Sequence, residues 1–147
     1  MPATAVASSA PTANILVLEN RHTGERLEIR RVRIDREEWL ELYGSLPPRG
    51  EGPPLHVHLS EAEEFHVVSG VLSAEVDGRR VRLVPGESAV FPPGSAHRWW
   101  NADDEPLVVR GFVIPERGPD RYLHAMFDIV NASPTGRPSL PCMAHLA

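Results

Sequence analysis

Hydrophobic residues along the chain come in short runs that turn-forming residues interrupt. Residues 14–19 form an apolar run, residues 72–76 alternate between apolar and polar, and residues 107–114 form a longer apolar run. Alternation with a period of two is typical of a β-strand that buries one face. The chain has 15 prolines and 11 glycines, and Asp77-Gly78 is a strong signal for a two-residue hairpin turn. The pattern predicts an all-β domain.

Two local features near the start of the chain modify this picture. The alternation that includes Ile29 changes phase before Val32, and such a change predicts a β-bulge near Arg31. Asp35, with Glu38 three residues later, has the pattern of a helix N-cap. We therefore expect a short N-terminal helix that begins after Asp35.

Beyond residue 118 the period of the pattern changes from that of a strand to that of a helix. The apolar residues there are spaced i, i+3, i+4 and i+7, namely Leu123, Met126, Phe127 and Val130. This spacing predicts a C-terminal amphipathic helix. Its apolar face could cover the core of the domain itself or pack against a second subunit, and the periodicity does not separate these two possibilities.

The length of 147 residues favours a single domain with a hydrophobic core. We divide the chain into a flexible lead-in over residues 1–13, a β-barrel over residues 14–115, and a C-terminal helix and tail over residues 116–147. The C-terminal part is expected to pack on the barrel or on a dimer partner. The lead-in lacks the positive segment and the sustained apolar segment of a signal peptide.

Composition and charge narrow the classes of function. Hydrophobic residues make up 41% and charged residues 24% of the chain, which is an ordinary soluble balance. The formal net charge of -5 argues against a nucleic-acid partner, because binding without sequence preference needs a basic surface. No apolar run reaches the roughly 18 residues of a membrane span, so we expect no membrane partner. A cytoplasmic location is the default expectation.

Three histidines and a glutamate are spaced in a way that suits one metal ion. His56 and His58 are two residues apart, so on a strand they point to the same face. By the same period Glu63 shares its face with Phe65, whereas the acidic residue that follows Glu63 points to the other face. His97 follows a Pro-Pro-Gly turn far along the chain, and a closed sheet would be needed to bring it back to the other three.

These residues lie in two motifs that resemble those of the cupin superfamily. The first motif has two glycines around His-x-His and a glutamate, and the residues that match it are Gly50, His56, His58, Glu63 and Gly70. The second motif has a glycine, Pro-x-Gly, a histidine and an asparagine, and the residues that match it are Gly86, Pro92, Gly94, His97 and Asn101. Both motifs match without a gap or a substitution.

The resemblance to cupins implies a small double-stranded β-helix, or jelly-roll, barrel. It also implies one divalent transition metal ion, which the side chains of His56, His58, Glu63 and His97 would hold near the centre of the barrel. Such a ligand set suits Fe, Mn, Ni, Co, Cu or Zn and does not choose among them. The family's habit of dimerising implies a homodimer.

Two aromatic residues are candidates for the wall of a substrate pocket. Trp99 lies two residues after His97, so it should share the inward face of a regular strand. Phe65 lies two residues after Glu63 and follows the same reasoning. Each side chain could line the pocket or could belong to the core of the barrel.

The expected function is that of a metal-dependent enzyme that acts on a small organic molecule, most simply a dioxygenase of the quercetinase-like, single-domain kind. Glu63 could also act as a catalytic base if it loosens from the metal. Two alternatives remain open, since one fold supports many functions. One is a non-catalytic protein that binds or senses a small ligand. The other is a cyclase or isomerase that uses the metal as a Lewis acid.

Overall fold

The computed structural model describes residues 15–114, 127–128, 131–132 and 134. Ten β-strands run through these residues: β1 (Leu16–Glu19), β2 (Arg26–Ile34), β3 (Glu37–Leu46), β4 (His56–Val57), β5 (Ala62–Ser69), β6 (Leu72–Val76), β7 (Arg79–Leu83), β8 (Ser88–Phe91), β9 (Ala96–Trp100) and β10 (Leu107–Ile114). The expected all-β class is therefore confirmed.

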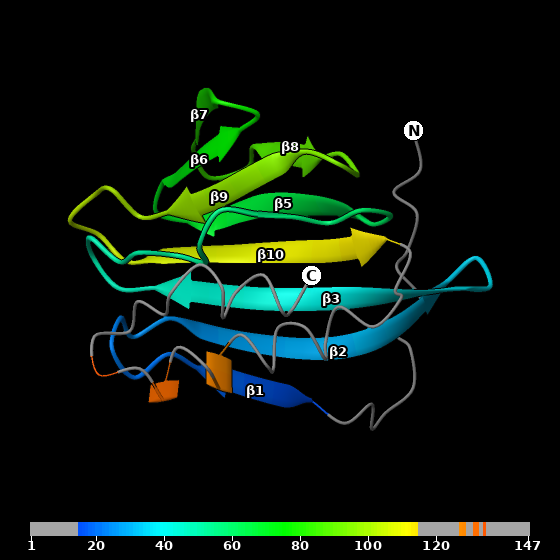
Figure 1. The fold of residues 1–147 in the computed structure, drawn as a ribbon, viewed down its shortest axis with the longest axis horizontal. Helices are drawn as coiled ribbons and strands as arrows, with labels where there is room; N and C mark the ends of the chain where they lie inside the picture. Colours follow the sequence, from blue (N-terminus) through cyan, green and yellow to red (C-terminus); the bar gives the residue numbers. More distant parts are fainter. Residues whose placement is uncertain (1–14, 115–126, 129–130, 133, 135–147) are drawn as a thin grey trace.

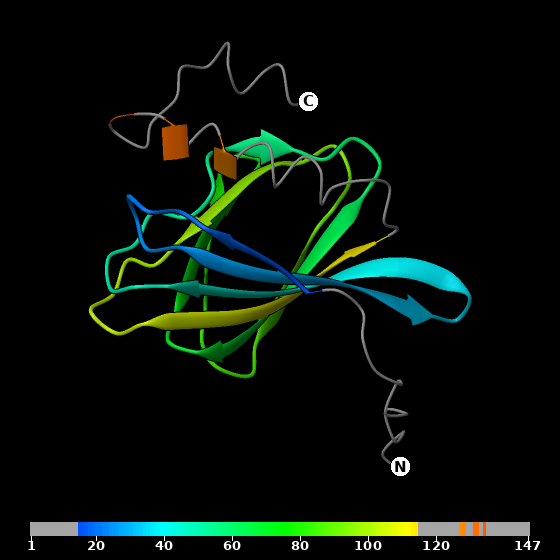
Figure 2. The same cartoon turned by 90° about the horizontal axis from the view of Figure 1, so that it is seen from below.

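The strands form two antiparallel sheets that face each other (Figures 1 and 2). The larger sheet has six strands in the order β1-β2-β3-β10-β5-β8, and the smaller has four in the order β4-β9-β6-β7. Strands that are far apart in sequence are neighbours in both sheets, as β3 and β10 are. This arrangement is the expected jelly roll, and it brings residues near 60 and residues near 97 to the same end of the barrel.

The predicted short N-terminal helix is wrong. Residues 35 and 36 are instead the two-residue turn of a long hairpin between β2 and β3, in which Ile34 pairs with Glu37. Asp35 and Arg36 both have positive φ angles, of 49° and 73°, as a type I′ hairpin turn requires. The helix-cap pattern after Asp35 is overridden because β3 pairs with β2 on one side and with β10 on the other.

The predicted bulge near Arg31 is also wrong, since β2 and β3 pair without a register shift. The phase change marks a switch of the apolar residues from one face of the sheet to the other. Ile29 is buried on the inner face, whereas Val32 is half-buried and lies directly opposite Trp39. The Trp39 ring in turn packs edge-on against Phe112, with the ring centroids 6.0 Å apart. An apolar patch on the outer face therefore explains the pattern.

The core of the barrel lies between the two sheets and is rich in aromatic rings. Phe65 of β5 packs against Trp99 of β9, with their ring centroids 5.4 Å apart, and both belong to one buried cluster. Gly111 lies opposite Phe65, and a Cβ at this glycine would come within 2.9 Å of the Phe65 ring. The missing side chain thus makes room for the aromatic residue.

A second buried cluster lies on β1, β2, β3 and β10 and includes Phe127. Phe127, Asp128, Asn131 and Ala132 are helical, but the rest of the predicted C-terminal helix lies outside the described residues, as does the lead-in over residues 1–13. The three-part division of the chain stays a prediction. Within the described part of the chain, no helix is long and apolar enough to cross a bilayer.

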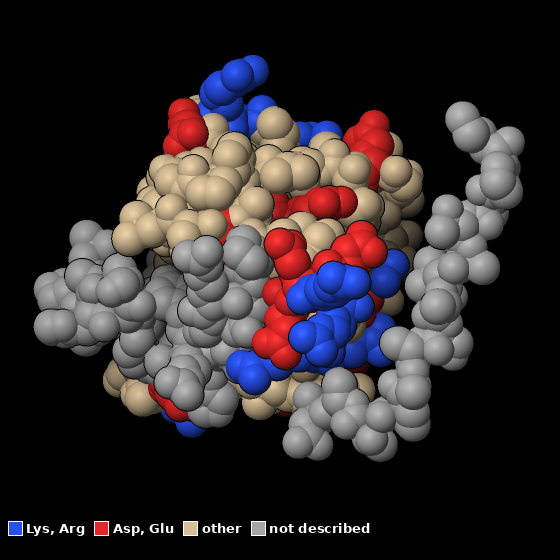
Figure 3. Space-filling view, turned by 90° about the vertical axis from the view of Figure 1, so that its right-hand side faces the viewer, with Lys and Arg blue, Asp and Glu red and all other residues tan. Residues whose placement is uncertain are grey.

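The β2–β3 hairpin projects from the end of the barrel and carries many of its charges. Figure 3 faces this end and shows acidic and basic side chains gathered together over the hairpin. The exposed residues there include Arg33, Arg36, Glu37 and Glu38. Because the two signs are interleaved, the hairpin carries no patch of a single sign on this face.

Candidate metal centre

The fold brings the four candidate ligands together at one end of the barrel. His56 lies on β4, His58 just after it, Glu63 near the start of β5 and His97 near the start of β9. His56 and His97 are direct cross-strand partners, and Glu63 reaches them from the opposite sheet. One potential ligand atom from each of the four side chains lies within 4.8 Å of the others.

The histidine rings converge on one oxygen of the glutamate. Glu63 Oε2 lies 2.9 Å from Nε2 of His97, 3.4 Å from Nε2 of His58 and 4.0 Å from Nε2 of His56. Each histidine therefore presents the same nitrogen toward the centre. The donor set is three imidazole nitrogens and one carboxylate oxygen, which suits a divalent transition metal.

Two backbone carbonyls orient the rings of this cluster. Nδ1 of His56 lies 2.7 Å from the carbonyl oxygen of Pro54, and Nδ1 of His97 lies 3.0 Å from that of Ser95. A carbonyl accepts hydrogen bonds, so each contact places a proton on Nδ1. For His56, whose pKa is lowered by burial, the Nε2 lone pair of a neutral ring is then directed inward. This is the tautomer that a metal ligand needs.

The electrostatics of the cluster favour the protonation states of metal ligands. Burial opposes the ionisation of Glu63, but hydrogen bonds from His58 and His97 outweigh it and lower the pKa of Glu63 to about 2. Burial lowers the pKa of His56 to about 4, although the charge of Glu63 acts in the opposite direction. For His58 the contact with Glu63 outweighs burial and raises the pKa. At neutral pH the cluster thus holds an ionised carboxylate and a neutral His56.

The cluster lies deep in the barrel. His97 is only 1% exposed, and the Phe91 ring packs against it with a centroid distance of 4.8 Å. The side chains of His56 and His58 are 7% and 10% exposed. A ligand would therefore approach from the side of β4 and the connection that follows it.

The two predicted pocket residues are buried as deeply as the candidate ligand His97. Phe65 and Trp99 face the interior, as strand parity predicts, but they are only 1% and 3% exposed. Phe65 packs against Phe91, which in turn contacts the His97 ring. In this conformation the two rings fill the barrel, and their role as a substrate wall stays a prediction.

Sequence reasoning missed three contributors to the cluster. The carbonyls of Pro54 and Ser95 carry no sequence signal, because any residue supplies a carbonyl. Phe91 pairs directly with Glu63 across β5 and β8, and its inward direction could have been read from the strand that precedes the Pro-Pro-Gly turn.

Comparisons with known proteins agree with this description. A family model described as "Cupin domain" matches residues 42–115, which is half of the chain. Oxidoreductase iacF of Pestalotiopsis fici is 37% identical over 79 residues, which are 52% of this chain and 39% of that protein. Probable oxidoreductase patJ of Aspergillus clavatus is 44% identical over 83 residues, which are 55% of this chain and 26% of that protein. The chain thus spans well under half the length of these relatives.

Solved structures share the fold at low sequence identity. An RmlC-like cupin from Shewanella frigidimarina is 20% identical, with a TM-score of 0.57, and the match covers 74% of this chain and 89% of that one. A protein described as a predicted oxalate decarboxylase from Thermotoga maritima is 19% identical, with a TM-score of 0.54, and the match covers 71% of this chain and 94% of that one. These likenesses establish the architecture.

Proposed function

The chain belongs to the cupin family, and on this premise we propose that it is a metal-dependent oxidoreductase acting on a small organic molecule. The reaction that we propose is a dioxygenation, in which both atoms of dioxygen enter an enol or phenol substrate. The observation that carries the proposal is the convergence of three imidazole nitrogens and one carboxylate oxygen at one end of the barrel.

The donor set of the four side chains suits a divalent transition metal ion. His56, His58, Glu63 and His97 would hold the ion, and three neutral imidazoles with one carboxylate leave a divalent ion with a net charge of about +1. Fe, Mn, Ni, Co or Cu would supply Lewis acidity and redox chemistry toward dioxygen there, whereas Zn would supply Lewis acidity alone.

The side chains of the cluster also suit the handling of a substrate. Glu63 is ionised at neutral pH, and if its carboxylate loosens from the metal it could accept the proton that an enol or phenol hydroxyl must lose. The buried rings of Phe91 and Phe65 exclude water from the inner side of the cluster.

The names of the curated relatives support an oxidoreductase activity. Both iacF and patJ carry that name, and each matches slightly more than half of this chain. Because the match covers only part of each relative and one fold supports many reactions, dioxygenation and the substrate class are our proposal. A homodimer and a cytoplasmic location are likewise expectations for this protein.

Oxygen uptake by the metal-loaded protein tests the proposal. The protein would be loaded in turn with Fe, Mn, Ni, Co, Cu and Zn and supplied with flavonols, catechols and diketones. We expect substrate-dependent oxygen consumption with at least one redox-active metal. Glu63→Gln should lower the rate by about 100-fold or more, in the range typical for loss of a general base.

A matched control is available on the same strand. His66 lies on the outer face of β5, away from the cluster, so His66→Gln should keep the wild-type rate. Equal rates for wild type and Glu63→Gln would contradict the proposal. Tight zinc binding without oxygen consumption would favour a Lewis-acid cyclase or isomerase, or a protein that only binds a small ligand.

A further inference from the structure

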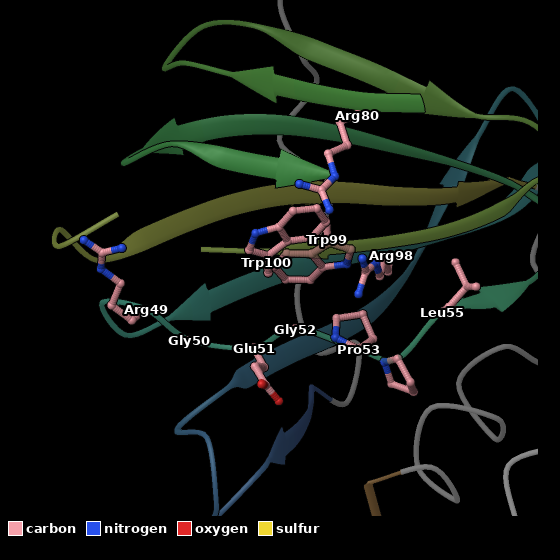
Figure 4. A pocket seen from close by; sticks show the side chains of 11 residues that line it. Arg49, Gly50, Glu51, Gly52, Pro53, Leu55, Arg80, Arg98, Trp99 and Trp100 are labelled. Carbon is pink, nitrogen blue, oxygen red and sulfur yellow. The ribbon is translucent and has the colours of Figure 1, made fainter. Parts of the chain in front are cut away.

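A groove lies on the outer face of the smaller sheet, outside the barrel that contains the histidine cluster. It is a cavity of about 550 Å³ between residues 49–55 and the side chains of Arg80, Arg98 and Trp100 (Figure 4). Cavities of this size are typical of sites for small molecules.

The groove and the histidine cluster lie on opposite faces of the same strand. His97 and Trp99 of β9 are buried and point into the barrel, whereas Arg98 and Trp100 are half-buried and point outward. The two sites are therefore separated by a strand, and a ligand in the groove would not contact the metal ligands.

One wall of the groove is held rigidly against β9. The backbone N–H of Asn101 donates to the carbonyl of Gly50 over 3.0 Å, and Glu51 forms a β-bridge with Trp100. A Cβ at Gly52 would lie 2.0 Å from the Trp99 carbonyl oxygen, so the backbone approaches more closely here than a side chain would allow. The groove is thus formed before any ligand binds.

The lining combines an aromatic surface with two cations. The guanidinium carbons of Arg98 and Arg80 lie 5.0 and 6.0 Å from the centroid of the Trp100 ring. In Figure 4 both arginines lie close to this ring, Pro53 lies near Arg98, and Leu55 lies farther from the indole. A planar apolar group could pack between the indole and the proline.

The charges at this point do not cancel. Arg98 and Arg80 both face Glu75 Oε2, at 3.2 and 3.7 Å, so one carboxylate stands against two guanidinium groups. The Arg49 guanidinium pairs with Asp104 at 2.7 Å, and the Glu51 carboxylate points away from Trp100 in Figure 4. Two guanidinium groups therefore face a single carboxylate beside the indole, on a chain whose net charge is -5.

We propose that this groove binds a small organic acid with a planar apolar body. The carboxylate of the ligand pairs with Arg80 and Arg98, and guanidinium groups suit carboxylates because they offer parallel N–H donors. The body of the ligand packs against Trp100 and Pro53. The inference does not depend on the metal or on the proposed reaction.

Nuclear magnetic resonance tests this site with benzoate as the probe. Benzoate would be titrated into the ¹⁵N-labelled chain of 147 residues at neutral pH, with the Trp100 indole N–H assigned through Trp100→Phe. We expect saturable shifts of the Trp100 indole and the Arg98 amide. Benzamide, which has the same shape without the charge, should bind at least about tenfold more weakly, since a charged hydrogen bond is lost.

Two variants and one control make the test specific. Arg98→Gln and Arg80→Gln should each weaken benzoate binding about tenfold, and the exposed side chain of Arg80 makes its replacement safe for folding. Arg82→Gln is the control, because Arg82 lies on the same face of β7, pairs with Asp103 and lies outside the groove.

Three results would overturn the proposal. The first is the absence of saturable shifts at Trp100. The second is an equal loss of affinity in Arg80→Gln and Arg82→Gln, which would indicate a general effect of charge. The third is a set of shifts confined to residues around His97, which would place benzoate at the histidine cluster.

Discussion

At the scale of single residues, two buried glutamates differ in their ionisation because their surroundings differ. Glu63 is ionised inside the barrel because three histidines surround its Oε2 atom. Glu25, directly before β2, is also buried, at 2% exposed. Its Oε1 atom has no hydrogen-bond partner within the part of the chain that the structure describes. Burial alone therefore raises the pKa of Glu25 to about 8.

The raised pKa of Glu25 makes the stability of the protein depend on pH. The folded pKa of about 8 lies above the ordinary value of 4.5, so the contribution of Glu25 is fully present below about pH 4.5 and is lost as the pH rises through 8. Relative to Glu25→Gln, the wild type should lose free energy of unfolding between pH 5 and pH 9. The loss is at most about 1.4 kcal/mol for each unit of pKa shift.

Urea unfolding at pH 5, 7 and 9 measures this difference. Glu28→Gln serves as the control, because Glu28 lies nearby in β2 but is not buried, and it should keep the pH dependence of the wild type. If the wild type and Glu25→Gln differed by the same amount at all three pH values, the buried carboxyl would not be the titrating group.

At the scale of elements, the β2–β3 hairpin shows where local sequence reasoning fails. Asp35-Arg36 lacks the Asn-Gly or Asp-Gly sequence of a typical two-residue turn, and Glu38 adds a helix-capping pattern. The hairpin forms because β3 pairs along its length with β2 and β10, a tertiary effect that local patterns do not contain. The β6–β7 hairpin was predictable, because its turn is Asp77-Gly78.

A substitution in the turn of the β2–β3 hairpin should make the protein more stable. Arg36 has a φ of 73°, a region that costs a non-glycine residue about 1–2 kcal/mol. Arg36→Gly should relieve this cost, in part offset by the greater freedom of glycine in the unfolded chain, and raise the free energy of unfolding by about 0.5–1 kcal/mol. Chemical denaturation monitored by circular dichroism measures the change.

Arg33→Gly is the matched control for this substitution. Arg33 is an exposed arginine inside β2, where glycine should instead lower stability by about 0.5–1 kcal/mol. Equal destabilisation by both substitutions would show that the positive φ at Arg36 carries no cost.

At the scale of the whole molecule, the sequence predicts the architecture and the set of converging side chains. Strand parity and motif spacing are regular features, so they place His56, His58, Glu63 and His97 correctly on inward faces. The groove beside Trp100 could not be predicted, because it needs the contact of residues 49–55 with β9, which no local pattern encodes. The same holds for the Pro54 carbonyl that orients His56.

The central claim is that the four converging side chains bind one metal ion, and metal analysis by mass spectrometry tests it most directly. The wild-type protein, equilibrated with a divalent transition metal and desalted, should retain about one ion per chain. His97→Gln should retain less than about a tenth of this while keeping the wild-type circular dichroism spectrum, since one of four ligands is lost. His66→Gln, outside the cluster, should retain as much as the wild type. Equal metal contents in the wild type and His97→Gln would contradict the claim.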